Sequence, residues 1–137
     1  MAKSYVGVPY AKKHRKPDDP YYYSPIFLDC CGLVRRVVKD LQTEFGFRLA
    51  MLNQNYQMDV CPIKLTFEQL QPGDLIFYRA TYYENYPKKK YQRHDLTHVE
   101  IFLGGETGTM SVASRRAKGV VTVFDDFHFK SKNYHRI

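Results

Sequence analysis

Two residues far apart in the chain, Cys30 and His98, are of the types that together perform nucleophilic catalysis. A cysteine thiolate attacks a carbonyl carbon, and an imidazole takes the thiol proton and later gives it to the leaving group. Each residue alone more often has another role, since a cysteine is commonly a small buried hydrophobe and a histidine a hydrogen-bonded surface residue. Such a pair is assembled by the fold, so the segments around the two residues decide the interpretation.

The residues that follow Cys30 have the pattern of an amphipathic helix. Asp29 is expected to be its N-cap, which places Cys30 in the first turn. Free backbone N–H groups and the helix dipole stabilise a thiolate there, so we expect Cys30 to ionise more readily than a cysteine in a helix interior. Apolar residues recur at helical spacing on one face and charged residues fill the other: Leu33, Val34, Val37, Val38 and Leu41 against Arg35, Arg36, Lys39 and Asp40.

His98 begins a segment with the alternating pattern of a strand. Val99, Ile101 and Leu103 alternate there with Glu100 and Phe102. We expect the imidazole to face the start of the helix across a cleft between the helix and the sheet.

Four segments in order resemble the motifs of the NlpC/p60 cysteine peptidases, a family with a papain-like fold. The resemblance covers residues 5–124, and four ordered motifs are more specific than any one of them. It implies that Cys30 is the nucleophile, that His98 is the base and that Tyr10 lines the substrate site, beside Asp29 and Cys31. The segments are Tyr5–Tyr10 (YVGVPY), Asp29–Val34 (DCCGLV), Leu70–Phe77 (LQPGDLIF) and His98–Gly104 (HVEIFLG).

The chain departs from the family pattern beside both candidate catalytic residues. The family usually has Ser after the nucleophile, and Cys31 stands there, which changes the hydrogen-bonding character of the pocket and with it the choice of substrate. The family usually has Gly after His-Val, and Glu100 stands there. Alternation places Glu100 on the same strand face as His98, where it either raises the basicity of the imidazole or is solvated.

A third departure concerns the residue that orients the base. The family places a polar residue there, commonly His, whereas Thr109–Ser114 contains no His. The corresponding position falls on Ser111 or on Val112. Ser111 would hold the ring through its hydroxyl, and it is our candidate for the third catalytic residue. With Val112 there, a water, a backbone carbonyl or another side chain would have to do so.

Length and element order predict one domain over residues 1–137, with 44% hydrophobic residues to form its core. Helices followed by an antiparallel sheet make an α+β fold, and the resemblance implies N-terminal helices packed on that sheet in the papain-like NlpC/p60 manner. We expect a helix from Cys30, a second over part of 41–57 interrupted by Gly46, one helical turn at Thr66–Leu70, and strands near 75–79, 97–103, 108–114 and 119–124.

The three cysteines do not form a disulfide framework, because two are adjacent and cannot easily bridge. Free thiols suit a reducing compartment, and the sequence has neither a signal peptide nor an apolar stretch of membrane-spanning length. We therefore expect a cytoplasmic location, unless a leader has been trimmed. No Cys or His spacing of a zinc site is present, and no metal or other cofactor is implied.

Three alternatives to a cysteine peptidase or amidase remain open. The net charge of +7 and the Tyr- and Lys-rich segment Ala80–Thr97 are compatible with nucleic-acid binding, although no nucleic-acid-binding motif is present. The same segment, if it is not merely solvated, would select an acidic peptide or other acidic amide substrate. The missing orienting His favours a catalytically silent binding module, and a thiol acyltransferase would use the same cysteine. The sequence does not determine the oligomeric state.

Overall fold

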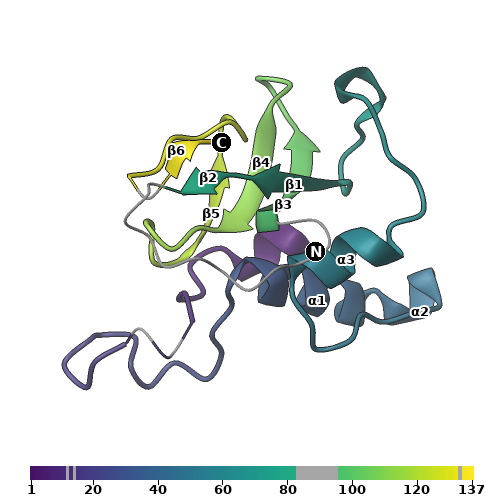
Figure 1. The fold of residues 1–137 in the computed structure, drawn as a ribbon. Coiled ribbons are helices and arrows are strands. Elements are labelled where there is room, and N and C mark those ends of the chain that lie inside the picture. Colours follow the sequence, from purple (N-terminus) through teal and green to yellow (C-terminus); the bar gives the residue numbers. More distant parts are fainter. Residues whose placement is uncertain (12, 14, 83–95, 133) are drawn as a thin grey trace.

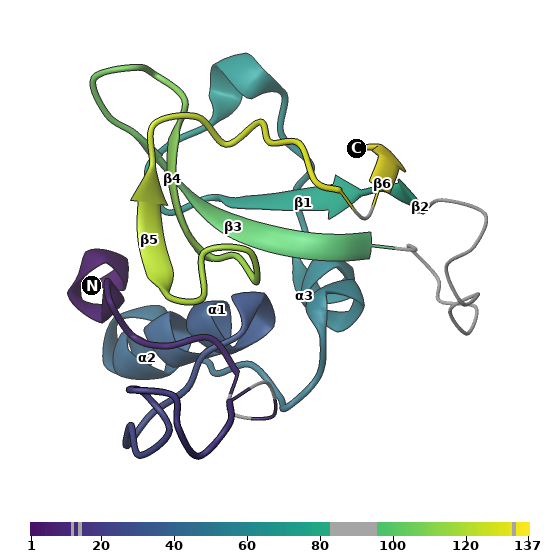
Figure 2. The same ribbon diagram turned by 90° about the vertical axis from the view of Figure 1, so that its left-hand side faces the viewer.

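The computed structural model describes residues 1–11, 13, 15–82, 96–132 and 134–137. Helices from the first half of the chain lie against one face of a four-stranded antiparallel sheet (Figures 1 and 2). The predicted α+β class, with N-terminal helices on an antiparallel sheet, is confirmed.

The first long helix, α1 (Cys30–Asp40), begins where the sequence predicted. Asp29 is its N-cap, and its Oδ1 accepts a hydrogen bond of 2.7 Å from the backbone N–H of Gly32. The apolar stripe Leu33, Val34 and Val37 is buried, as the helical spacing indicated. Burial of that stripe fixes the helix on the sheet, and its first turn carries Cys30.

The predicted second helix is divided in two by Gly46. Helix α2 (Gln42–Phe45) ends there because Gly46 has a φ of 72°, a left-handed conformation that glycine adopts without strain. Helix α3 (Gln54–Val60) follows. The single turn expected before the sheet is a short 3₁₀ helix, Phe67–Gln69, and another 3₁₀ helix, Ala2–Tyr5, opens the chain.

The main sheet has the order β1-β3-β4-β5, and every neighbouring pair is antiparallel. Each of the four predicted strands is present. A separate two-stranded sheet, β2-β6, was not predicted. The strands are β1 (Leu75–Arg79), β2 (Thr81–Tyr82), β3 (Leu96–Gly104), β4 (Met110–Ser114), β5 (Val121–Phe124) and β6 (Tyr134–Arg136).

The register of β3 against β1 contains one irregularity. Tyr78 pairs with His98, but Arg79 pairs with Leu96, so Thr97 is an extra residue on β3. This is a β-bulge immediately before His98. From His98 to Ile101 the pairing with β1 is regular, so side chains alternate strictly along this part of the strand.

The two faces of β3 belong to two different layers. On the helix side, Val99 and Ile101 pack with α1 in the apolar core. That core fills the junction of α1 and the sheet, where the sequence analysis expected a cleft. His98 and Glu100 lie on the opposite face, beside the C-terminal segment that carries Phe127. The core cluster consists of Leu28, Leu33, Val34, Val37, Val99, Ile101, Val112 and Val121.

The connection between β2 and β3, residues 83–95, lies outside the described residues, and so does most of the Tyr- and Lys-rich segment for which a role in substrate choice was predicted. Within the described ranges, no helix is long and apolar enough to cross a membrane.

Candidate active site

Cys30 is the first residue of α1, and its thiol lies against the start of β3. The backbone N–H of Val99, the residue after His98, donates to the Cys30 thiol. The Sγ atoms of Cys30 and Cys31 are 3.7 Å apart. The candidate nucleophile is therefore held between its neighbour in the helix and the backbone of the strand that carries the candidate base.

The environment of Cys30 disfavours its ionisation. Contact with the Cys31 sulfur, together with burial, raises the pKa of Cys30 well above its usual range. The Val99 N–H acts in the opposite direction but does not outweigh these effects. From the sequence, a helix terminus that favours a thiolate was expected. In the structure, the second sulfur and burial instead raise the pKa of Cys30.

Cys31 is buried and takes part in a polar network that joins three elements. Its thiol donates to Gln54 Oε1 at 2.9 Å, and Gln54 Nε2 donates to the backbone oxygen of Leu96 at 2.7 Å. Gln57 Nε2 also donates to the backbone oxygen of Cys31, at 3.0 Å. Cys31 therefore ties α1 to α3 and, through Gln54, to β3.

His98 is buried between aromatic rings and faces a carboxylate. Its ring centroid is 5.4 Å from that of Tyr78 and 5.5 Å from that of Phe129. Its Nε2 is 2.9 Å from Oε1 of Glu100. The alternation that placed Glu100 and His98 on one face is confirmed, and of the two expectations for Glu100, solvation is wrong.

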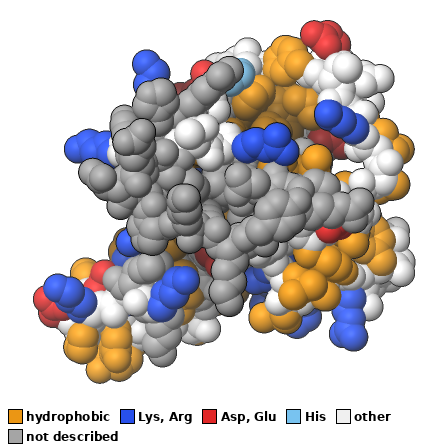
Figure 3. Space-filling model, in the orientation of Figure 1, with side chains coloured by type: hydrophobic (Ala, Val, Ile, Leu, Met, Phe, Trp, Pro, Cys, Tyr) orange, Lys and Arg blue, Asp and Glu red, His pale blue; other side chains and the backbone are white. Residues whose placement is uncertain are grey.

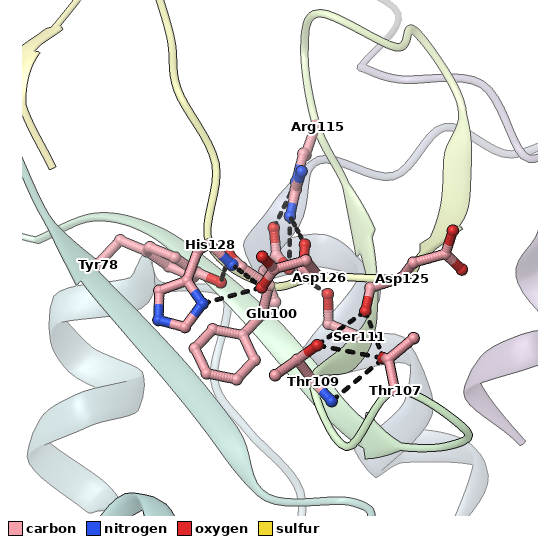
Figure 4. Close-up of polar contacts among 10 residues, drawn as sticks. Tyr78, Glu100, Thr107, Thr109, Ser111, Arg115, Asp125, Asp126 and His128 are labelled. Carbon is pink, nitrogen blue, oxygen red and sulfur yellow. Dashed lines mark hydrogen bonds and ion pairs between the residues drawn. The ribbon is translucent and has the colours of Figure 1, made fainter.

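Glu100 is the centre of a buried ionic cluster (Figure 4). Its side chain is fully buried and accepts hydrogen bonds from Arg115 Nε at 2.6 Å and Nη2 at 3.1 Å and from the Ser111 hydroxyl. His98 is its fourth contact. Burial opposes its ionisation, but these hydrogen bonds outweigh burial and hold the pKa of Glu100 below its ordinary value. Glu100 is therefore a carboxylate at neutral pH.

A carboxylate at this position also determines the tautomer of His98. Glu100 can only accept, so Nε2 of a neutral imidazole must carry the proton. Nδ1 is then unprotonated, which is the form a general base needs.

Ser111 does not hold the imidazole directly. Its hydroxyl donates to Glu100 Oε2, so it positions the carboxylate that in turn contacts His98. The alternative position, Val112, lies in the apolar core on the helix side of the sheet. The expected direct contact between Ser111 and His98 is corrected accordingly. The departure at Glu100 was the sequence signal for the true neighbour of the ring.

Arg115 was not among the sequence candidates. Its guanidinium stacks on Phe124 at 3.6 Å and on Phe129 at 4.5 Å from the ring centroids. It also binds Glu100 (Figure 4). These partners come from β3, β5 and the C-terminal segment. No local pattern around Arg115 indicates that the fold brings them together.

The structure does not bring the imidazole of His98 to the thiol of Cys30. No hydrogen bond joins these two described residues. The thiol packs on the helix side of β3, whereas His98 shares the other face with Tyr78 and Glu100. The backbone of β3 links the two sites, because Val99, the residue after His98, donates its N–H to the thiol.

Tyr10 lies at the start of α1 with the thiols. Burial, together with the nearby Cys30 and Asp29, raises the pKa of Tyr10 to about 12. Its backbone N–H donates to Gly119 at 2.7 Å, and Pro9 bridges Val120, so the end of the first motif is attached to the start of β5. Of the candidate substrate-binding residues, Tyr10, Asp29 and Cys31 all surround Cys30.

In the part of the chain that the structure describes, no group of three or more His, Cys, Asp or Glu side chains could hold a metal ion. No protein-family model, curated protein or solved structure matched the chain.

Proposed function

We propose that the chain is a cysteine hydrolase, a peptidase or amidase of the NlpC/p60 type with a papain-like fold. The observation that carries the proposal is the His98–Glu100 pair, in which a buried carboxylate orients the imidazole. The next residue on β3, Val99, donates its backbone N–H to the Cys30 thiol. The position of Cys30 at the start of α1 supports it further, because the first N–H groups of a helix have no partner within the helix and can stabilise an oxyanion.

The proposed reaction uses Nδ1 of His98, because Nε2 is occupied by Glu100. Nδ1 takes the thiol proton as Cys30 Sγ attacks the carbonyl carbon, and the backbone N–H of Cys30 stabilises the oxyanion. The proton then passes to the leaving amine, which gives an acyl-enzyme. Water, activated by the same nitrogen, hydrolyses the thioester. In the arrangement described here, Glu100 holds the ring proton on Nε2 and so leaves Nδ1 free to accept one.

This chemistry requires a local change at the start of β3. In the structure the ring of His98 and the thiol of Cys30 lie on different faces of the strand. The raised pKa of Cys30 keeps it a thiol in this arrangement. We therefore propose that the arrangement described here is a resting state, and that His98 turns toward Cys30 when substrate binds.

A second candidate is a catalytically silent domain that binds a partner. The separation of His98 from Cys30 favours it, because the His98, Glu100 and Arg115 cluster would then serve only to stabilise the fold.

Acylation by a small activated ester separates the two candidates without knowledge of the substrate. The protein is mixed with p-nitrophenyl acetate, and the acetylated residue is identified by mass spectrometry. A hydrolase acetylates Cys30, more slowly after His98→Ala and not after Cys30→Ala. Cys61→Ser and His128→Ala are matched controls, since Cys61 and the exposed His128 lie outside the site. Acetylation of Cys30 that is unaffected by His98→Ala supports the silent domain.

A further inference from the structure

A second feature of α1 lies on the side of the helix that faces away from the sheet. A groove of about 950 Å³ runs there, lined by the exposed face of α1, by residues 26–29 before it and by residues 48–51 after α2. Gly32, Arg35 and Lys39 line this groove, whereas Leu33, Val34 and Val37 face the core. Helical geometry therefore places these three residues opposite Cys30, and of the candidate site residues Asp29 alone also lines the groove.

The groove is strongly basic. Five cationic side chains line it: Lys13, Arg35, Arg36, Lys39 and Arg48. Two of the five have nearby partners. Arg36 forms an ion pair of 3.2 Å with Asp40, and Arg35 donates to the backbone oxygen of Leu52. Asp29, the carboxylate among the lining residues, is occupied as the N-cap. Lys39 and Arg48 are exposed and stay available to a ligand.

Exposed apolar side chains lie beside these cations. Met51 is 86% exposed, and Phe47 and Leu52 are each 53% exposed. Phe47 stacks on Phe45, with ring centroids 5.8 Å apart. Figure 3 shows hydrophobic and basic side chains next to one another over the helical layer, at the lower right of that view. A cluster of exposed apolar residues on a domain surface commonly marks a site for a protein partner.

We propose that this groove binds an acidic peptide segment of a partner protein, in which Asp or Glu residues alternate with apolar ones. Carboxylates complement the cations of α1 and Arg48, and apolar side chains cover Met51 and Leu52. From Gly32 to Lys39 the helix rises about 10 Å, which matches about three residues of an extended chain. The site is independent of the proposed hydrolase activity, because Cys30 is on the other side of the helix.

Fluorescence anisotropy with a labelled peptide of Glu-Glu-Leu repeats tests this proposal. The test variant is Lys39→Glu with Arg48→Glu, and the matched control is Lys118→Glu with Lys132→Glu. All four residues are exposed, and both pairs change the net charge equally. We expect the dissociation constant to rise about tenfold for the groove pair and less than about twofold for the control pair. Met51→Ser should weaken binding about threefold through lost apolar contact.

Several outcomes overturn the proposal. One is equal binding of a Gln-Gln-Leu peptide, and another is an equal loss in the control pair. Tighter binding of single-stranded RNA, lost with the same two groove residues, would assign the groove to nucleic acid instead. If the charge-reversed protein does not fold, Lys39→Gln with Arg48→Gln gives the same comparison. Binding should be unchanged in Cys30→Ala, so failure here and failure of the hydrolase proposal are distinguishable.

Discussion

Nε2 of His98 and Oε1 of Glu100 lie 2.9 Å apart although the two residues belong to one strand. Residues two positions apart share a face of a strand, and burial of that face brings their side chains into contact. Arg115 and Ser111 complete the coordination of the carboxylate from β4 and the residue after it. The pair is therefore part of the packing of the sheet as well as a candidate catalytic unit.

Loss of the charge on Glu100 should destabilise the fold. Glu100→Gln keeps the shape of the side chain but leaves Arg115 without a buried carboxylate, and removing one partner of a buried ion pair costs roughly 3 kcal/mol. We expect this decrease in the free energy of unfolding, measured by urea denaturation. The double variant Glu100→Gln, Arg115→Met has no unpaired charge and should be more stable than the single variant. A single variant as stable as the parent would contradict the role of the cluster.

Glu100 should also contribute to the acid sensitivity of the protein. Its pKa is lower in the folded state than its ordinary value of 4.5, so the folded state binds fewer protons. The stability that it contributes is fully present above pH 4.5 and is lost as the pH falls through the folded pKa. Urea denaturation across this acid range measures the loss. In Glu100→Gln the free energy of unfolding should depend less steeply on pH in this range. An unchanged slope would mean that Glu100 does not contribute to the acid sensitivity.

The thiol pair predicts an unusual alkylation profile. Since Cys31 and burial raise the pKa of Cys30, Cys30 should react with iodoacetamide at pH 7 more slowly than a free cysteine, and faster as the pH increases. Cys31→Ser removes the neighbouring sulfur and should accelerate the reaction at pH 7. Mass spectrometry of the alkylated peptide gives both rates. Cys61→Ser is the control and should leave the alkylation rate of Cys30 unchanged. If Cys30 reacts at the parent rate in Cys31→Ser, the sulfur contact does not govern its ionisation.

The connection between β3 and β4 offers a matched pair of glycine substitutions. Gly105 and Gly108 have φ values of 62° and 72°, so alanine at either position is strained by about 1 kcal/mol. A Cβ at Gly105 would also clash with the Met110 side chain, whereas at Gly108 it meets nothing within 4 Å. Gly105→Ala should therefore lower the free energy of unfolding by about 1 kcal/mol more than Gly108→Ala. Equal losses in chemical denaturation would mean that Met110 moves aside freely.

Local patterns predicted the elements better than the site. The apolar spacing after Asp29 and the capping role of Asp29 determine α1, and alternation determines the four strands of the main sheet. The β2-β6 pair could not be predicted, because it joins very short strands from residues 81 and 136. Strands of two or three residues are too short to show an alternating pattern of apolar and polar residues, so neither segment indicates its pairing with the other.

The sequence predicted one contact of the candidate site, that of Glu100 with His98, but not the rest of its geometry. Alternation placed Glu100 beside His98, yet the burial of Glu100 depends on Arg115 and on the C-terminal segment, which no motif near His98 indicates. Ser111 was a candidate because the position of the family's orienting residue falls on it or on Val112, and its hydroxyl lies one contact further from the ring, on Glu100. The face that His98 occupies depends on strand register, and register is a property of the pairing rather than of the segment.

The extra residue Thr97 determines which face of the sheet each following side chain of β3 occupies. It lies just before His98, and from there onward the side chains of β3 alternate between the helix layer and the layer of Glu100. If the bulge moved to just after His98, the imidazole would change sides while Val99 and Ile101 kept their places in the core. Hydrogen exchange of the Val99 amide measures how often this occurs. Whether His98 stays beside Glu100 or faces the Cys30 thiol would then depend on a displacement of one residue along one strand.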